Sequence, residues 1–296
     1  MKRIERIVVV ADTGTEQHAL ARALSIAHST GAAVELIGFV HDSAVADNPR
    51  LPARDRRQAT RRMLDERRKG LERHIREAAV PVSLRVVWTR LLADWLCTYA
   101  ATLRAALVVK TNHPSGRPWY VPSDWLLMRE LRAPLLLVNP DAARGGAGAL
   151  ATLNAGARSA RAQAIDRSVL AAAGWWTRNC GGPAQAAYVH EVPPLPLDLG
   201  IVDRRAYLKA QEHVAVRRLV ARLRAGPRGV AFRRHALLGR PERALPRLAR
   251  QLRPAVTVMG TAARRGLPRF FVGSTAEQVI PALGTDVLVV KPAGRR

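Results

Sequence analysis

The feature that most constrains the fold is an internal repeat with a spacing of about 150 residues. Leu107-Val108-Val109-Lys110-Thr111 corresponds to Thr257-Val258-Met259-Gly260-Thr261, and the two flanking matches pair Tyr120–Ser123 with Phe271–Ser274 and Leu135–Pro140 with Val287–Pro292. A repeat of this length corresponds to two domains, each close to the usual domain size. The sequence therefore predicts one domain over residues 1–140 and a second over residues 149–296. The segment between them, 141–148, is rich in small residues and has no periodicity, as is typical of a linker.

Both halves alternate short apolar runs with amphipathic segments. In the first half the expected strands are 6–11, 34–40, 83–88, 106–110 and 135–138, and the expected helices are 16–30, 55–79, 95–103 and 125–131. In the second half the expected strands are 150–154, 185–190, 230–235, 255–259 and 286–290, and the expected helices are 165–180, 204–224, 242–252 and 276–283. This alternation predicts an α/β protein made of two doubly wound, five-stranded parallel sheets. Ligands of such sheets bind beyond the carboxyl ends of the strands, at the switch point.

The end of the chain contains a glycine-bearing loop between a strand and a helix. The apolar run 255–259 stops at Gly260, and Gly273-Ser274-Thr275 precedes the last expected helix. Such loops let backbone N–H groups approach a phosphate, and Arg264 and Arg265 in the loop would neutralise its charge. An alternative interpretation is a simple helix cap by Ser274 or Thr275. The spacing matches neither the Walker A pattern nor G-x-G-x-x-G.

This loop resembles that of the universal stress protein family, which runs Gly, two residues, Gly, nine residues, Gly and then Ser or Thr. Gly260, Gly273 and Ser274 fall on that frame, whereas Ala263 replaces the middle glycine. The resemblance covers almost the whole chain and is strongest in the last 40 residues. The pairing of two such halves is similar to the tandem, E-type members of the family.

The resemblance implies Rossmann-like domains that bind ATP or a related adenine nucleotide. At the end of the first strand the family places an aspartate that contacts the nucleoside; in the second half this position is Asn154, which has no charge and adds an NH₂ donor. Val189 takes the position that flanks adenine in the family, and the alternative is that it serves only in the core. A side chain at Ala263 costs about 1 kcal/mol if that position needs a positive φ. The predicted nucleotide-binding residues are Asn154, Val189, Gly260, Ala263, Arg264, Arg265, Gly273, Ser274 and Thr275.

The first half has the opposite pattern. Asp12 stands where the nucleoside contact belongs, but Lys110 replaces Gly260, and Pro122, which has no N–H group, replaces Gly273. We expect Lys110 to pair with Asp12 or an anion, or to serve on the surface or in a cap. The first domain is therefore predicted to be degenerate, so that nucleotide binds only the second.

The charge balance is strongly basic. The chain carries 48 Lys and Arg against 23 Asp and Glu, a net charge of +25. Residues 1–140 contribute 22 basic and 14 acidic side chains, or +8, and residues 141–296 contribute 26 and 9, or +17. Only five of the basic residues are lysine, so a GC-rich genome is one explanation. The other is a polyanion partner. The alternative function is thus a nucleotide-independent interaction protein that binds nucleic acid or acidic lipid through its basic surface.

No catalytic motif is present, because the eight histidines form neither H-E-x-x-H nor a Cys-His metal spacing. The family resemblance implies a binding module of the stress response, with slow ATP hydrolysis at most. Two cysteines, Cys97 and Cys180, and no apolar run of about 18 residues indicate a cytoplasmic protein without a membrane span. Family resemblance implies that the fifth strands of the two halves meet in an intramolecular pseudo-dimer; homodimerisation of whole chains is a further option.

Overall fold

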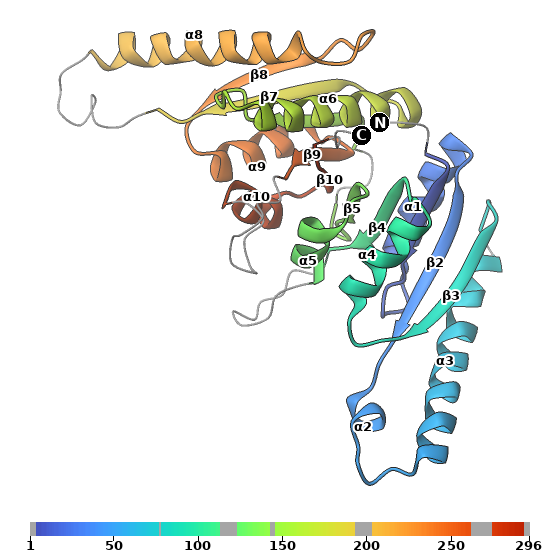
Figure 1. The fold of residues 1–296 in the computed structure, drawn as a ribbon. Coiled ribbons are helices and arrows are strands. Elements are labelled where there is room, and N and C mark those ends of the chain that lie inside the picture. The colour runs from blue at the N-terminus through green and yellow to red at the C-terminus, as the bar shows by residue number, and fades with distance from the viewer. Residues whose placement is uncertain are drawn as a thin grey trace. The chain divides into compact units, whose positions relative to one another are not determined.

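The computed structural model of the chain describes residues 4–112 except 77, then 123–142, 146–192, 203–261 and 274–292. The chain divides into two compact units, residues 2–140 and residues 141–296 with Met1. Figure 1 shows the elements of both units, and each unit is described separately below. Within the described ranges, none of the helices has the length and apolar character needed to span a membrane.

The first unit is built on five parallel strands in the order β3-β2-β1-β4-β5. The strands are β1 (Arg6–Val10), β2 (Ala33–Val40), β3 (Val82–Trp88), β4 (Leu107–Thr111) and β5 (Leu135–Val138). All residues of β4 and β5 are buried, and so are four of the five residues of β1. The strand order reverses between β1 and β4, which places the switch point at the carboxyl ends of these two strands.

The helices of the first unit connect successive strands. They are α1 (His18–Thr30), α2 (Ser43–Ala46), α3 (Ala53–Arg76), α4 (Leu92–Thr102) and α5 (Ser123–Glu130). α1 ends at Gly31, whose φ of 70° makes it a left-handed C-cap. Right-handed crossovers place α1 and α3 on one face of the sheet and α4 and α5 on the other. The expected helices are all present, although α4 begins three residues before its expected start, and α2 has no counterpart among them.

The second unit repeats this arrangement, with the strand order β8-β7-β6-β9-β10. The strands are β6 (Ala149–Leu153), β7 (Ala184–His190), β8 (Arg233–Leu238), β9 (Val256–Gly260) and β10 (Asp286–Val290). β8 begins three residues later than expected, because the segment before it turns at Gly229, whose φ is 76°. The switch point here lies between β6 and β9, which pair at Ala151 and Val258.

The helices of the second unit are α6 (Ala160–Cys180), α8 (Arg204–Leu223), α9 (Pro241–Leu252) and the short α10 (Ser274–Val279), followed by the 3-10 turn η1 (Ile280–Ala282). In Figure 1, α6 and α8 cover one face of this sheet and α9 and α10 the other. α6 begins five residues earlier than expected. Its N-cap is Ser159, whose hydroxyl accepts a hydrogen bond from the Ala162 N–H group at 3.2 Å. The five-stranded parallel domains predicted from the sequence are therefore confirmed, whereas the pairing of their fifth strands stays a prediction.

The end of the segment expected to be a linker is packed tightly into the second unit. Ala147 N donates to Arg253 O at 3.2 Å, and Ala255 N donates to Gly148 O at 3.1 Å. Gly148 has a φ of 75°, and a Cβ atom there would lie 2.6 Å from Pro183 N. Residues 146–148 are therefore packed against the second unit and are not a free linker, because a side chain at Gly146 or Gly148 would collide with neighbouring backbone.

This packing generates a stability prediction. Gly148→Ala should lower the free energy of unfolding by about 2–4 kcal/mol, because the new Cβ combines left-handed strain with overpacking against Pro183. Urea denaturation measures the loss. Gly284→Ala is the matched control, since a Cβ at Gly284 meets nothing within 4 Å. Equal stabilities for the two variants would contradict the prediction.

Candidate functional site

The switch point of the second unit brings two of the predicted site residues to one edge. Asn154 directly follows β6, and Gly260 is the last residue of the neighbouring β9. The Asn154 side chain is exposed. Because parallel strands end at the same edge of a sheet, these positions flank the crevice in which doubly wound domains bind ligands.

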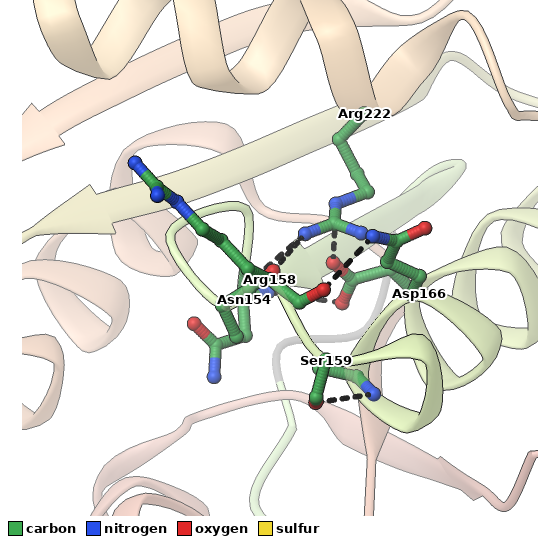
Figure 2. Close-up of polar contacts among 8 residues, drawn as sticks. Asn154, Arg158, Ser159, Asp166 and Arg222 are labelled. Carbon is green, nitrogen blue, oxygen red and sulfur yellow. Dashed lines mark hydrogen bonds and ion pairs between the residues drawn. The ribbon is translucent and has the colours of Figure 1, made fainter.

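The backbone at Asn154 is fixed by an ion pair from two helices. Asn154 N donates to the Asp166 carboxylate on α6 at 3.0 Å, and Arg222 of α8 pairs with the other oxygen of that carboxylate at 3.0 Å. Arg222 also donates to the Ala157 carbonyl at 2.6 Å. Figure 2 shows the Asn154 and Arg158 side chains pointing away from this pair. Asp166 and Arg222 therefore fix the backbone of the loop after β6, while the Asn154 side-chain amide points away from them and stays available to a ligand.

The Asp166–Arg222 pair is buried, and burial has an electrostatic cost. The Asp166 side chain is 2% exposed and that of Arg222 is 10% exposed. Burial raises the pKa of Asp166, and the Asn154 N–H group and the Arg222 guanidinium oppose this rise without cancelling it. The pair therefore defines the loop's conformation more than it stabilises the domain.

A second polar cluster lies beside this loop, at the end of β7. His190 Nε2 lies 2.9 Å from Gln211 Oε1, and Tyr188 Oη lies 3.2 Å from His190 Nδ1. Arg218 donates to Tyr188 Oη at 3.3 Å. Because an amide oxygen only accepts hydrogen bonds, the His190 proton sits on Nε2 and Nδ1 accepts. A Cβ at Gly156 would lie 2.6 Å from Tyr188 Oη, so the loop after β6 rests directly on this cluster.

Val189, the predicted adenine-flanking residue, lies within β7 between two members of this cluster. It is half-buried and pairs with Leu237 of β8. It therefore lies on the strand next to β6, on the side of β6 opposite β9. Val189 therefore packs within the sheet and also lies near the carboxyl-terminal end of β7.

Packing within the domain gives a reason for a glycine at position 260 that is separate from the expected role in a phosphate loop. The sequence predicts that a phosphate loop departs from its strand at Gly260. Gly260 is the last residue of β9 and pairs with Val290. A Cβ there would collide with Ile165 of α6 and lie 3.2 Å from Val169 Cγ2. The absence of a side chain at Gly260 is therefore required by the close approach of α6.

The rest of the predicted loop is only partly described. Ala263, Arg264, Arg265 and Gly273 lie outside the described residues, and their assignment stays a prediction. Ser274 is the first residue of α10. Thr275, in the first turn of α10, is exposed.

The corresponding edge of the first unit is filled by its own side chains. Asp12, which follows β1, is 7% exposed. Its carbonyl accepts from Arg67 of α3 at 2.5 Å and from Gln17 at 3.0 Å, and its carboxylate accepts from Ala19 N at 3.3 Å. Burial lowers the pKa of Arg67, and the nearby Asp12 charge opposes this effect. Where the second unit exposes Asn154, the first unit encloses Asp12.

Lys110 fills the same edge, and its expected place on the surface was wrong because it is buried. Among the described residues its ion-pair partner is Asp124, not Asp12. Its Nζ lies 2.7 Å from the Asp124 carboxylate of α5 and donates to the Thr111 carbonyl at 2.9 Å. A lysine and its carboxylate thus lie at the end of β4, where the second unit has Gly260 at the end of β9.

Sequence reasoning missed the residues that hold the site. Asp166 and Arg222 are 56 positions apart, and a contact between two helices leaves no fixed spacing to recognise. One signal was present: Gln211, Arg218 and Arg222 follow an i, i+7, i+11 pattern and so lie on one stripe of α8. Within the described ranges, groups of three or more His, Cys, Asp or Glu side chains suited to a metal ion are absent.

The steric interpretation of Gly260 predicts a specific coupling. Gly260→Ala should lower the free energy of unfolding by about 1–3 kcal/mol because it overpacks the contact with α6. The same substitution should cost less in an Ile165→Ala background, since the colliding methyl group is gone. A double-mutant cycle by urea denaturation measures the coupling. Additive effects would show that something other than Ile165 requires the glycine.

The pKa of Asp166 predicts a pH dependence with a definite sign. Because the pKa is higher in the folded than in the unfolded chain, the stabilising effect of protonation is complete below pH 3.8 and is lost as pH rises through the folded pKa. As pH falls from 7 to 4, the free energy of unfolding of the wild type should therefore rise relative to that of Asp166→Asn. Denaturation of both proteins across this range tests the sign, and a relative loss on acidification would show that the Arg222 pair outweighs burial.

Comparison with known proteins places this geometry in a family. A model of the Universal stress protein family matches residues 3–119 and 162–291. Universal stress protein E of Salmonella typhi is 25% identical and that of Escherichia coli (strain K12) 24% identical, each alignment covering 97% of this chain and 93% of the relative.

Solved structures agree on the fold. The crystal structure of a functionally unknown protein from Pseudomonas aeruginosa PAO1 has a TM-score of 0.65 at 24% identity and covers 98% of this chain and 93% of that one. A universal stress protein from Archaeoglobus fulgidus DSM 4304 has a TM-score of 0.63 at 13% identity, with 98% and 97% covered. With the family model matching both halves, the chain belongs to the universal stress protein family as a tandem, two-domain member.

Proposed function

We propose that this protein is a cytoplasmic binding module of the stress response that takes up one adenine nucleotide, ATP or a close relative, in its second domain. The observation that carries the proposal is the contrast between the two switch points. In the second domain Asn154 is exposed beside the end of β9. In the first domain Arg67 contacts Asp12 and the Lys110–Asp124 pair is buried at the same edge. The described part of one edge exposes a polar side chain, whereas the described part of the other buries its charged side chains.

The role of Asn154 in this proposal is to recognise the nucleoside. Its side-chain oxygen accepts and its NH₂ group donates, so it can bond to an adenine or a ribose hydroxyl without a charge. Asp166 and Arg222 hold its backbone, which means that little conformational freedom is lost on binding. Val189 flanks the base, and Gly260 and Thr275 lie at the two ends of the loop.

The phosphate groups are assigned to the loop between these two residues. Arg264 and Arg265 would supply positive charge, and Gly273 and Ser274 would supply backbone N–H groups at the start of α10. Ala263 adds a methyl group where the family has a glycine. We therefore propose binding weaker than that of a complete loop.

Binding without efficient catalysis follows from the side chains near Asn154. The described carboxylate closest to its backbone belongs to Asp166, which is buried and paired with Arg222. A general base must reach the attacking water, and Asp166 is instead committed to the loop. We propose slow hydrolysis of ATP at most.

Calorimetric titration of the full-length protein with ATP tests the proposal. We expect one site per chain. Asn154→Ala should weaken binding about two- to tenfold, the loss of one or two hydrogen bonds. Asn154→Asp restores the family's carboxylate and should strengthen binding, because charge-assisted hydrogen bonds are stronger. Asn48→Ala removes an asparagine from a loop of the first domain and should leave affinity unchanged.

Gly273→Val tests the loop independently of Asn154. A branched side chain would obstruct the approach of a phosphate to the backbone and should abolish ATP binding. The proposal is overturned if the wild type binds no ATP at millimolar concentration. Two sites per chain, or unchanged affinity in Asn154→Ala, would likewise reject it.

A further inference from the structure

The outer face of α9 carries an unbroken arginine stripe, formed by Arg243, Arg247 and Arg250. These residues are spaced i, i+4 and i+7 and therefore share one face of the helix. All three are exposed, whereas Leu245, Leu248 and Ala249 on the opposite side are buried. The fold thus exposes three arginine side chains on one face of a helix whose other face is buried.

The stripe has no acidic partner on its own helix face. The only acidic residue of α9 is Glu242, in the first turn. Among the described residues, no ion pair involves any of the three arginines. On α3, by contrast, Asp55, Asp65 and Glu66 are exposed among the arginines. The charge of the stripe is therefore left for an external anion.

The first domain supplies an internal comparison. Its equivalent helix is α4, and a shift of 149 residues aligns the first residues of α4 and α9, Leu92 and Pro241. The same shift places Asp94, Thr98 and Ala101 at the three positions of the stripe, and all three are exposed. One chain, with one genomic composition, thus carries arginines on one copy of this helix and none on the other. Compositional bias does not explain that difference.

The geometry of the stripe fits the backbone of a nucleic-acid duplex. At a rise of 1.5 Å per residue, Arg243 and Arg250 lie about 10 Å apart along the helix axis. Over that length a duplex carries roughly six phosphate charges. Single strands are bound through stacking aromatic side chains, and α9 has none.

A membrane surface fits the stripe less well. Helices that lie on membranes insert an apolar face between headgroups, but the apolar face of α9 is buried in its own domain. The exposed large hydrophobic residues among those described are Leu91 and Val216, and neither belongs to α9. An anionic membrane would therefore be held only by the charge of the three arginines, without an inserted apolar face.

We propose that the arginine stripe of α9 binds the phosphate backbone of duplex nucleic acid without sequence selectivity. This activity is separate from the nucleotide site, since it needs neither Asn154 nor the loop after β9. Its energy comes from counterions released when guanidinium groups neutralise phosphates, and it is therefore strongly dependent on salt.

The test is fluorescence anisotropy of labelled 20-base-pair DNA and RNA duplexes with the full-length protein, without ATP, over a range of NaCl concentrations. The variant Arg243→Gln/Arg247→Gln/Arg250→Gln should bind on the order of a hundredfold more weakly near 0.1 M salt. The slope of log K against log salt should become shallower by about 2.7, or about 0.9 per lost contact. Whichever duplex binds more tightly identifies the preferred form. Thermal unfolding confirms that the variant is folded.

The matched control is Arg57→Gln/Arg61→Gln/Arg68→Gln on α3, which removes the same charge from three exposed positions. It should keep nearly the wild-type affinity and slope. Equal losses in the two variants would show that net charge alone attracts the duplex, and the proposal would be wrong. It would also be wrong if neither duplex binds at low salt, including the case in which phosphatidylglycerol vesicles bind instead.

Discussion

The ion pair between Asp166 and Arg222 determines the geometry of the second domain's edge. It ties α6 and α8 to the loop after β6, and removing one member of such a buried pair typically costs about 3–5 kcal/mol. Asp166 lies in the second turn of α6, directly after Ile165, whose side chain lies against the end of β9. Only a glycine fits beneath Ile165, so Gly260 follows from the same contact. The buried pair thus holds the backbone after β6, and the residue next to Asp166 occupies the space that a side chain at Gly260 would need.

The first domain has the same strand order but fills its edge differently. Lys110 brings a long side chain to the end of β4, and a buried ammonium group requires a carboxylate nearby, which Asp124 supplies. Arg67 likewise contacts the Asp12 carbonyl from α3. These contacts satisfy polar groups within the domain itself. The two domains therefore differ at the described part of this edge: one buries its charged side chains, and the other presents an exposed polar side chain.

The fold was predictable because alternation of strands and helices is a local signal, repeated twice. Asn154 and Gly260 were also placed correctly at the strand ends, since these positions depend only on where the apolar runs stop. The reason for Gly260 was missed, because it depends on Ile165, almost a hundred residues away. Lys110 was wrongly expected at the surface or beside Asp12, since its partner Asp124 is on a separate element. Sequence patterns report the neighbours of a residue along the chain, and contacts between elements decide what its side chain does.

The same distinction applies to charge. A net charge of +25 is a property of the whole chain and identifies no surface. The fold decides where this charge lies. α9 and α4 occupy equivalent places and both bury an apolar side, yet only α9 exposes arginines. α4 forms its helix with Asp94, Thr98 and Ala101 at these positions, so a helix in this place of the fold does not depend on arginine. The three arginines of α9 share one exposed face and have no counterpart on α4. Binding to an anionic partner is therefore the better explanation for them than folding.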